Sequence, residues 1–280
     1  MANTSSASSE SHLSILMRFA HATFFTNTHH GPNAGSSLSW EARCVSAASR
    51  YIYHALINGG AEYLERVAAL NGRVFDTDPV VKYMLLDMSF EERLAYLPTY
   101  WSTLVRSALM NDALITEADG WKAASVIIPP GKAIENVWTL LYAGFLGVLW
   151  KIGFAGLKRL WMEFSGMTDN AKMKGLHGQR RYYYVFSIGT EGEYRGKGLA
   201  KEIMRHHQNT ARDENLPIWL EATSPGSRHL YLSMGFQEVE EIVLGKGKVG
   251  ADANTKPGGS GVPLWAMVWW PESSEFATQS

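Results

Sequence analysis

The segment YYYVFSIGTEGEYRGKGLAKEIMRHH, residues 182–207, joins two patterns that few folds accommodate in direct succession. Its first part is dense in β-branched and aromatic residues, which predicts a central strand. Farther along, Leu199, Ile203, Met204 and His207 recur three and four residues apart, which predicts a helix. Two glycines, in RGKG, lie between the patterns. The chain must therefore build a strand, a glycine turn and a helix in that order, as α/β folds do.

The rest of the chain alternates between helical and strand patterns. Residues 59–75 have helical spacing, and Ser89 and Glu92 form a capping box that opens a second helix, which Pro98 should kink or divide. The other expected helices lie at 133–165, as one or two apolar helices, and at 227–235. Strands are expected at 41–48, twice within 113–131 around Asp119-Gly120, and at 217–223, 236–245 and 263–271. We therefore expect an α/β fold with one central twisted mixed sheet of about seven strands and helices on both faces.

Charge, cysteine content and motif spacing exclude several classes of protein. The net charge of −1 does not favour a nucleic-acid surface. The single cysteine, Cys44, allows no intrachain disulfide, so a reducing, cytoplasmic location is expected. The start has no secretory signal, and the apolar stretch 137–150 is shorter than the roughly 20 residues of a membrane span. No H-x-x-x-H or C-x-x-C spacing indicates a metal site.

The glycine turn predicts a site for a ligand with several phosphates. Amide groups at a helix start are unpaired and carry partial positive charge, and glycine lets a phosphate approach them closely. Arg195, Lys197, Lys201 and Arg205 add positive side chains, although Lys197 and Arg205 are each also consistent with plain solvent exposure. The G-x-x-x-x-G-K-[ST] loop of nucleotide hydrolases and the G-x-G-x-x-G of dinucleotide folds are both absent.

The turn contains R-x-x-G-x-A, formed by Arg195, Gly198 and Ala200. Together with the strands VFSIGT and PIWLEAT and the later LYLSMGF, it resembles the GNAT acyltransferase superfamily, whose [QR]-x-x-G-x-[GA] motif holds the pyrophosphate of acetyl-CoA. The stretches VFDTDPVVKYMLLD, SVIIPPG and LWAMVWWP are similar to the puromycin-acetyltransferase-like branch of small-molecule acetyltransferases. The resemblance covers roughly residues 60–271 and implies a GNAT fold. The chain departs from the family in its long N-terminal extension, its Gly-rich stretch and Ala200, where the family often has Gly.

The resemblance also implies which residues bind the cofactor. The main-chain groups of Ile188, Gly189 and Thr190 would hold the pantetheine arm like an added strand, unless they are an ordinary strand end. Ser224 and Ser227 would hydrogen-bond the cofactor, or cap the following helix. The pyrophosphate would lie against Arg195, Gly196, Lys197, Gly198, Leu199, Ala200 and Lys201.

The same resemblance points to catalytic side chains. Tyr231 is expected to protonate the departing thiolate of coenzyme A, because a phenol is still protonated at neutral pH. The alternative is that Tyr231 only packs on a short amphipathic helix. Glu221 is the expected base, acting directly or through water, or else a satisfied polar residue at a strand end. Weaker candidates for the base are His177, His206, His207 and His229.

The expected organisation is a single GNAT domain at 37–271, with an acceptor-side half at 37–180 and an acetyl-CoA-binding half at 181–271. Residues 1–36 are expected to be a mostly mobile tail and 272–280 a C-terminal tail, and 245–261 a flexible loop too rich in glycine to pack. Trp138, Tyr142, Phe145, Trp150 and Trp161 would roof an acceptor pocket or simply pack.

The expected function is N-acetylation of a small-molecule amine, as in detoxification, with acetyl-CoA as donor and no metal. Direct attack in a ternary complex would rely on positioning the amine and stabilising the developing oxyanion. The alternatives are a protein or peptide N-acetyltransferase and a non-catalytic CoA-binding module.

Overall fold

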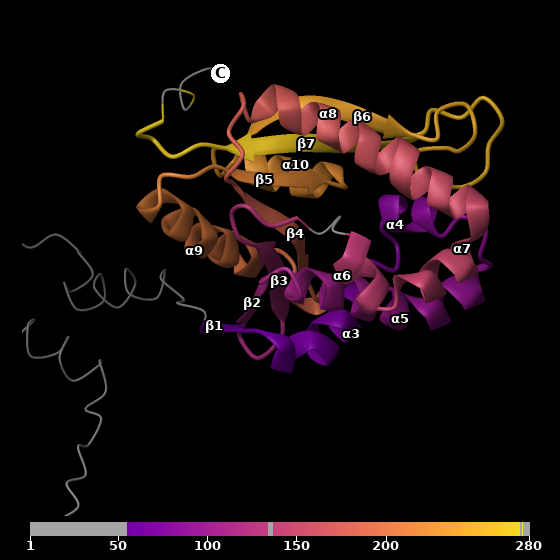
Figure 1. The fold of residues 1–280 in the computed structure, drawn as a ribbon, viewed down its shortest axis with the longest axis horizontal. Coiled ribbons are helices and arrows are strands. Elements are labelled where there is room, and N and C mark those ends of the chain that lie inside the picture. The colour runs from indigo at the N-terminus through magenta and orange to yellow at the C-terminus, as the bar shows by residue number, and fades with distance from the viewer. Residues whose placement is uncertain (1–54, 134–136, 275, 277–280) are drawn as a thin grey trace, which may run out of the picture. The chain divides into compact units, whose positions relative to one another are not determined.

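The computed structural model describes residues 55–133, 137–274 and 276, and its seven-stranded sheet has the order β1-β2-β3-β4-β5-β7-β6 (Figure 1). The mixed sheet of about seven strands is therefore confirmed, with the strand that precedes the glycine turn at its centre. The strand expected at 41–48 lies outside the described residues. The strands are β1 (Leu56–Gly59), β2 (Leu114–Ala118), β3 (Ala123–Ile128), β4 (Tyr183–Thr190), β5 (Ile218–Ala222), β6 (Gln237–Leu244) and β7 (Val262–Trp269).

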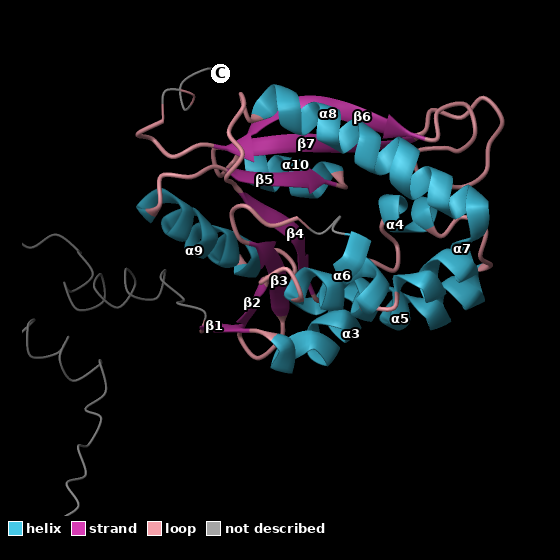
Figure 2. Cartoon of the chain, in the orientation of Figure 1, coloured by secondary structure: helices cyan, strands magenta, loops and turns pink. Residues whose placement is uncertain are grey.

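Helices cover both faces of this sheet, and Figure 2 shows α9 on the opposite side of β2–β4 from α3, α5 and α6. Side chains of β3 alternate accordingly, because Val126 packs with α3 and α5 whereas Ile127 packs with α9. The helices are α3 (Leu64–Val74), α4 (Pro79–Met84), α5 (Phe90–Leu109), α6 (Val137–Tyr142), α7 (Phe145–Lys158), α8 (Gly166–Gly175), α9 (Leu199–Asp213) and α10 (Pro225–Leu232). Short 3₁₀ segments η1 (Ala61–Tyr63) and η3 (Gly192–Tyr194) and the π-helical η2 (Arg159–Ser165) complete the described part.

The capping box predicted for α5 is confirmed, since the Ser89 side chain accepts from the Glu92 amide and the Glu92 side chain accepts from the Ser89 amide. Pro98, however, does not divide this helix. A proline inside a helix removes one backbone hydrogen bond and crowds the preceding turn. Tertiary packing offsets that cost, because α3 and α5 approach so closely that a Cβ added at Gly72 would lie 3.6 Å from the Pro98 nitrogen.

The Gly-rich stretch 245–261 packs against the domain, so the expectation that it would not pack is wrong. Val249 and Ala253 are buried in the main core cluster. The Gly247 amide donates to the Gly259 carbonyl at 2.8 Å, and a Cβ added at Gly259 would lie 2.2 Å from the Val249 carbonyl oxygen. Glycine is needed here so that two backbone segments can approach each other, which is the opposite of a flexible linker.

His207 of α9 is buried and its Nε2 lies 2.8 Å from Ser125 Oγ of β3, so it is a packed histidine. Burial, with a smaller contribution from nearby His206, lowers the pKa of His207 to about 3. In the unfolded chain His207 therefore binds a proton near pH 6.5, whereas in the folded chain it binds one only near pH 3.

Because of this residue, we expect the free energy of unfolding of the wild type to fall by up to ~1.4 kcal/mol per pH unit as the pH drops below 6.5, the pKa of histidine in the unfolded chain. His207→Gln should flatten that slope in a denaturant titration repeated across pH, whereas His229→Gln, at an exposed position, should not. Identical slopes in wild type and His207→Gln would contradict the assignment.

Candidate active site

The central feature of the sheet is that β4 and β5 separate soon after they meet. These parallel strands pair only at Tyr183 with Ile218 and Tyr184 with Trp219, while β4 continues to Thr190. On its other side β4 stays paired with β3, but a register shift leaves Phe186 without a partner, as in a β-bulge. From Val185 onward, the edge of β4 that faces β5 therefore pairs with no described strand.

A cavity of about 1180 Å³ lies along this opening and joins two sets of elements. The cavity is lined by the outer part of β4, the glycine turn, the start of α9, and α10. Its lining also includes the α3–α4 connection, α4, α5 and residues of the segment 140–169. The predicted residues Ile188, Gly189 and Thr190 lie along the β4 wall.

The glycine turn places an uncapped helix end at the cavity. Gly196 and Gly198 have φ values of 77° and 88°, in the left-handed region that favours glycine. Gly198 is the N-cap of α9 and supplies no side chain, so within the described residues the amides of Leu199, Ala200 and Lys201 have no backbone acceptor. This is the arrangement that binds phosphate oxygens.

The charged side chains of the turn have separate roles. The guanidinium of Arg195 donates to the Thr190 carbonyl at 3.2 Å and to the Val74 carbonyl at 3.3 Å, which ties the turn to the end of α3. Lys201 lines the cavity, whereas Lys197 does not and instead lies over the ring of Tyr194, 4.7 Å from its centroid. All the other predicted cofactor-binding residues line the cavity: Ile188, Gly189, Thr190, Arg195, Gly196, Gly198, Leu199, Ala200, Lys201, Ser224 and Ser227.

Replacing Gly198 with Ala should weaken binding of a phosphate ligand. A Cβ at φ 88° costs about 1–2 kcal/mol of backbone strain and crowds the approach to the α9 amides, so we expect the KM for acetyl-CoA to rise about tenfold. Gly192→Ala is the matched control, because that glycine precedes the turn, lacks a positive φ and has open space around its Cβ. Equal KM values for the two variants would contradict the phosphate site.

Tyr231 of α10 is buried and lines the cavity. Within the described residues no hydrogen bond to its hydroxyl is present, and burial raises its pKa well above the ordinary range of a phenol. The phenol therefore stays protonated at neutral pH. Ser224 and Ser227 form a reciprocal capping box at the start of α10, which is the alternative that the sequence left open for them, and both also line the cavity.

Glu221 projects from β5 into the region where the two strands separate. Its Oε2 accepts from the Tyr184 hydroxyl at 2.8 Å and its Oε1 from the Trp219 indole at 2.6 Å. These bonds orient the carboxylate from both sides, since Tyr184 belongs to β4 and Trp219 belongs to β5, the strand that also carries Glu221. The carboxylate lines the cavity, so both interpretations of Glu221, base and satisfied polar residue, fit its position.

Asp78 is a cavity residue that sequence reasoning missed. Its Oδ1 accepts from the amides of Val80 and Val81 and its Oδ2 from the Thr223 hydroxyl at 2.5 Å, so it joins the start of α4 to the loop after β5. Burial raises the pKa of Asp78, against these hydrogen bonds, which lower it. The Asp-Pro pair at 78–79 is the available signal, because Asp at the N-cap followed by Pro marks a helix start.

The predicted aromatic roof is only partly correct. Phe145 lines the cavity, but Trp138, Tyr142 and Trp150 are exposed, and the side chain of Trp161 lies outside the described part. The apolar lining comes instead from the inner sides of several helices and from the α3–α4 connection: Phe75, Met84, Tyr100, Trp101, Leu104, Leu140, Leu160 and Phe164.

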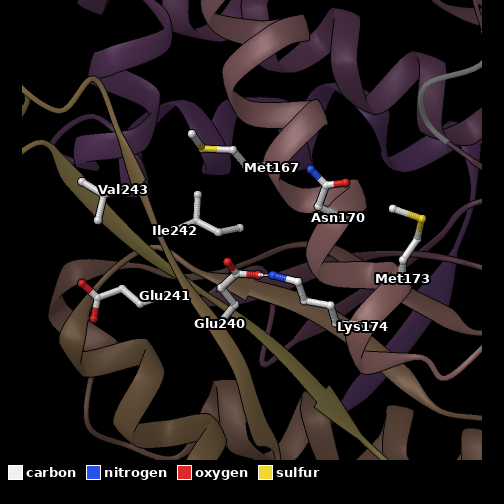
Figure 3. Close-up of a pocket in the computed structure, with 8 residues that line it drawn as sticks. All are labelled: Met167, Asn170, Met173, Lys174, Glu240, Glu241, Ile242 and Val243. Carbon is white, nitrogen blue, oxygen red and sulfur yellow. Dashed lines mark hydrogen bonds and ion pairs between the residues drawn. The ribbon is translucent and has the colours of Figure 1, made fainter.

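A second cavity, of about 600 Å³, lies between α8 and β6, away from these residues (Figure 3). Its lining includes Met167 and Met173, and Lys174 pairs with Glu240 across it at 2.6 Å. None of the predicted site residues contributes to it, whereas most of them line the cavity along β4.

Residues 137–236, from α6 to the end of the α10 turn, match the model of the acetyltransferase (GNAT) family. The matched segment and a relative of similar sequence support an acyltransferase of the GNAT type. An uncharacterized N-acetyltransferase of Schizosaccharomyces pombe is 26% identical over 220 residues, which are 78% of this chain and 84% of the relative. The sequence-based identification of a GNAT acyltransferase is thereby confirmed at the level of the family.

Solved structures share the fold. A histone acetyltransferase HPA2-related protein of Corynebacterium glutamicum has a TM-score of 0.53 and 15% identity, with 80% of this GNAT chain and 99% of that chain covered. An arylalkylamine N-acetyltransferase 7 of the mosquito Aedes aegypti has the same TM-score and identity, with 78% and 87% covered. At this identity the likeness establishes the GNAT fold alone.

Proposed function

We propose that this acetyltransferase moves the acetyl group of acetyl-CoA to the amine of a small molecule, in the puromycin-acetyltransferase-like manner that its sequence resembles. The observation that carries the proposal is the single cavity that extends from the open edge of β4 to apolar walls formed by α4, α5 and residues of the segment 140–169. A donor at one end and an acceptor at the other meet without leaving the protein, as direct transfer in a ternary complex requires.

The donor end, formed by β4, the glycine turn and α10, offers a binding group for each part of acetyl-CoA. The unpaired edge of β4 at Ile188–Thr190 offers amides and carbonyls to the pantetheine arm, which binds like an added strand. The pyrophosphate lies against the amides at the start of α9. These positions put the thioester between β4 and β5, near Tyr231 and Glu221, which both line that part of the cavity.

Each side chain then has a defined task in the transfer. The neutral amine attacks the thioester carbonyl, the C–S bond breaks, and the Tyr231 phenol protonates the departing thiolate. Glu221 takes the proton that the amine loses, directly or through water. A β4 amide stabilises the developing oxyanion, because its N–H group is already oriented before the charge forms.

The acceptor end favours a small cationic amine with an apolar body. The apolar walls are mainly aromatic and aliphatic, and the carboxylates in the cavity lining are Asp78, Asp169 and Glu221, of which Asp169 pairs with Lys172 at 3.5 Å. Carboxylates attract an ammonium group, and apolar walls bind the rest of the molecule. Because solved structures named for histones and for arylalkylamines share the fold equally, the choice of a small molecule rests on the apolar lining of this cavity.

A competition assay tests the substrate class. We expect thiol release from acetyl-CoA with at least one arylalkylamine or alkylamine, and little with a mixed peptide library at the same amine concentration. Turnover with peptides and none with small amines would overturn the proposal in favour of a protein N-acetyltransferase. Acetyl-CoA binding without turnover on either panel would indicate a binding module. We further propose a cytoplasmic role in amine detoxification, in keeping with the lone Cys44.

A further inference from the structure

Tyr100 of α5 is a buried phenol in the wall of the cavity along β4. The residue is 6% exposed, belongs to the main core cluster and lines the cavity with Trp101 and Leu104 of the same helix. Within the described residues no hydrogen bond reaches its hydroxyl, and its oxygen is not among the unpaired polar atoms that the protein seals from solvent. The cavity that Tyr100 lines therefore gives a ligand access to this hydroxyl.

Packing alone does not account for a phenol at this position. The ring makes an edge contact with Trp101, with 5.9 Å between the ring centroids, and phenylalanine would make the same contact. A buried hydroxyl without a partner destabilises a fold, because it has lost its hydrogen bonds to water. In the wall of a cavity such a hydroxyl gains its partner from the ligand, as the few polar groups of apolar binding sites do.

The carboxylate of Asp78 is a charged group that acts on Tyr100. Burial is the main cause that raises the pKa of Tyr100 well above the ordinary range of a phenol, and the charge of Asp78 and the neighbouring Tyr96 raise it further. Tyr100 therefore stays protonated at neutral pH and is able to donate a hydrogen bond. Asp78 also lines the cavity, at the start of α4.

Asp78 keeps the capacity for one more hydrogen bond. An ionised carboxylate accepts hydrogen bonds at about four positions. The amides of Val80 and Val81 occupy two of these on Oδ1, and the Thr223 hydroxyl occupies one on Oδ2. A position on Oδ2 thus remains for a donor from the cavity.

The donor at Tyr100 and the acceptor at Asp78 together define the group that satisfies both. That group has to accept one hydrogen bond and donate another, which a hydroxyl does. An ammonium group would pair with Asp78 but leave the Tyr100 proton without an acceptor, and an ether or ketone would leave Asp78 without a donor. We propose that Tyr100 and Asp78 form a subsite for a hydroxyl group of the acceptor, so that the substrate is a hydroxylated small amine. This inference rests on the proposed acetylation of a small amine and narrows its substrate class.

The test is calorimetric titration of amines into the full chain saturated with coenzyme A, which measures acceptor binding without turnover. Two pairs of amines differ by one hydroxyl: hydroxybenzylamine with benzylamine, and aminopentanol with pentylamine. We expect the hydroxylated amine of at least one pair to bind the wild type about tenfold more tightly than its partner. Tyr100→Phe should reduce this preference to about twofold or less, because the ligand hydroxyl loses its donor.

The matched control is Tyr96→Phe, one turn earlier in α5, because Tyr96 does not line the cavity. It should leave the preference unchanged. Thermal melting of both variants verifies folding, and removal of an unpaired hydroxyl predicts little change.

Three outcomes would overturn the subsite. They are equal binding within both pairs by the wild type, an unchanged preference in Tyr100→Phe, and tighter binding of diaminopentane than of aminopentanol. Failure of the proposed function looks different: hydroxylated amines would bind with the expected preference, but none would release thiol from acetyl-CoA.

Discussion

Tyr231→Phe is expected to lower kcat about 100-fold or more, with little change in the KM for acetyl-CoA. The substitution removes a hydroxyl that forms no hydrogen bond among the described residues and keeps the ring that packs in the core. Stability should therefore be preserved while the proton for the departing thiolate is lost. Because burial raises the pKa of Tyr231, its deprotonation should not limit the rate anywhere near neutral pH.

The control is Tyr183→Phe, since the Tyr183 hydroxyl donates to Glu214 at 2.7 Å and does not line the cavity. It should leave kcat unchanged. Wild-type kcat in Tyr231→Phe would show that another group protonates the thiolate. An equal loss of kcat in both variants would point to a general structural effect of removing a buried phenol hydroxyl.

Asp78→Ala is expected to destabilise the fold by about 2 kcal/mol and to raise the KM for the amine about tenfold. The substitution removes both capping bonds of α4 and the acceptor of the Thr223 hydroxyl, which links the acceptor side to the loop after β5. It also removes a carboxylate from the lining of the cavity. Denaturant unfolding and steady-state kinetics measure the two effects separately.

Asp78→Asn separates charge from structure. The amide oxygen can still cap α4 and the amide nitrogen can donate to Thr223, so stability should be retained while the KM for a cationic amine rises. Because burial raises the pKa of Asp78, the folded state holds its proton more tightly than the unfolded state. Wild type should therefore lose stability relative to Asp78→Asn as pH rises from its ordinary value of 3.8 through the raised one. An Asp78→Ala protein as stable as wild type would contradict this account.

Strong local patterns made most of the fold predictable. The β-rich run before the glycine turn and the helical spacing after it correspond to β4 and α9, and Ser89 with Glu92 gave the start of α5. β1 was missed because Leu56–Gly59 is too short to show alternation. The bulge at Phe186 was also missed, since it depends on pairing with β3 and changes nothing in the local sequence.

One half of the candidate site was likewise predictable from the sequence, and the other half was not. Its donor half depends on a contiguous turn, and the sequence motif placed Gly198, Ala200 and Lys201 at the cavity. The acceptor half is assembled from helices far apart in sequence, so apolar periodicity could not tell which side of each would face the cavity. Trp150 and Phe145 illustrate this, because both are aromatic residues of α7 but one faces solvent and the other the cavity.

The most direct test of the account is the initial velocity of thiol release with acetyl-CoA and an accepted amine both varied. Direct attack in a ternary complex predicts double-reciprocal lines that intersect, with no thiol release when the amine is absent. Parallel lines, or a burst of thiol from acetyl-CoA alone, would mean that the protein is acetylated first and would contradict direct transfer along the cavity beside β4.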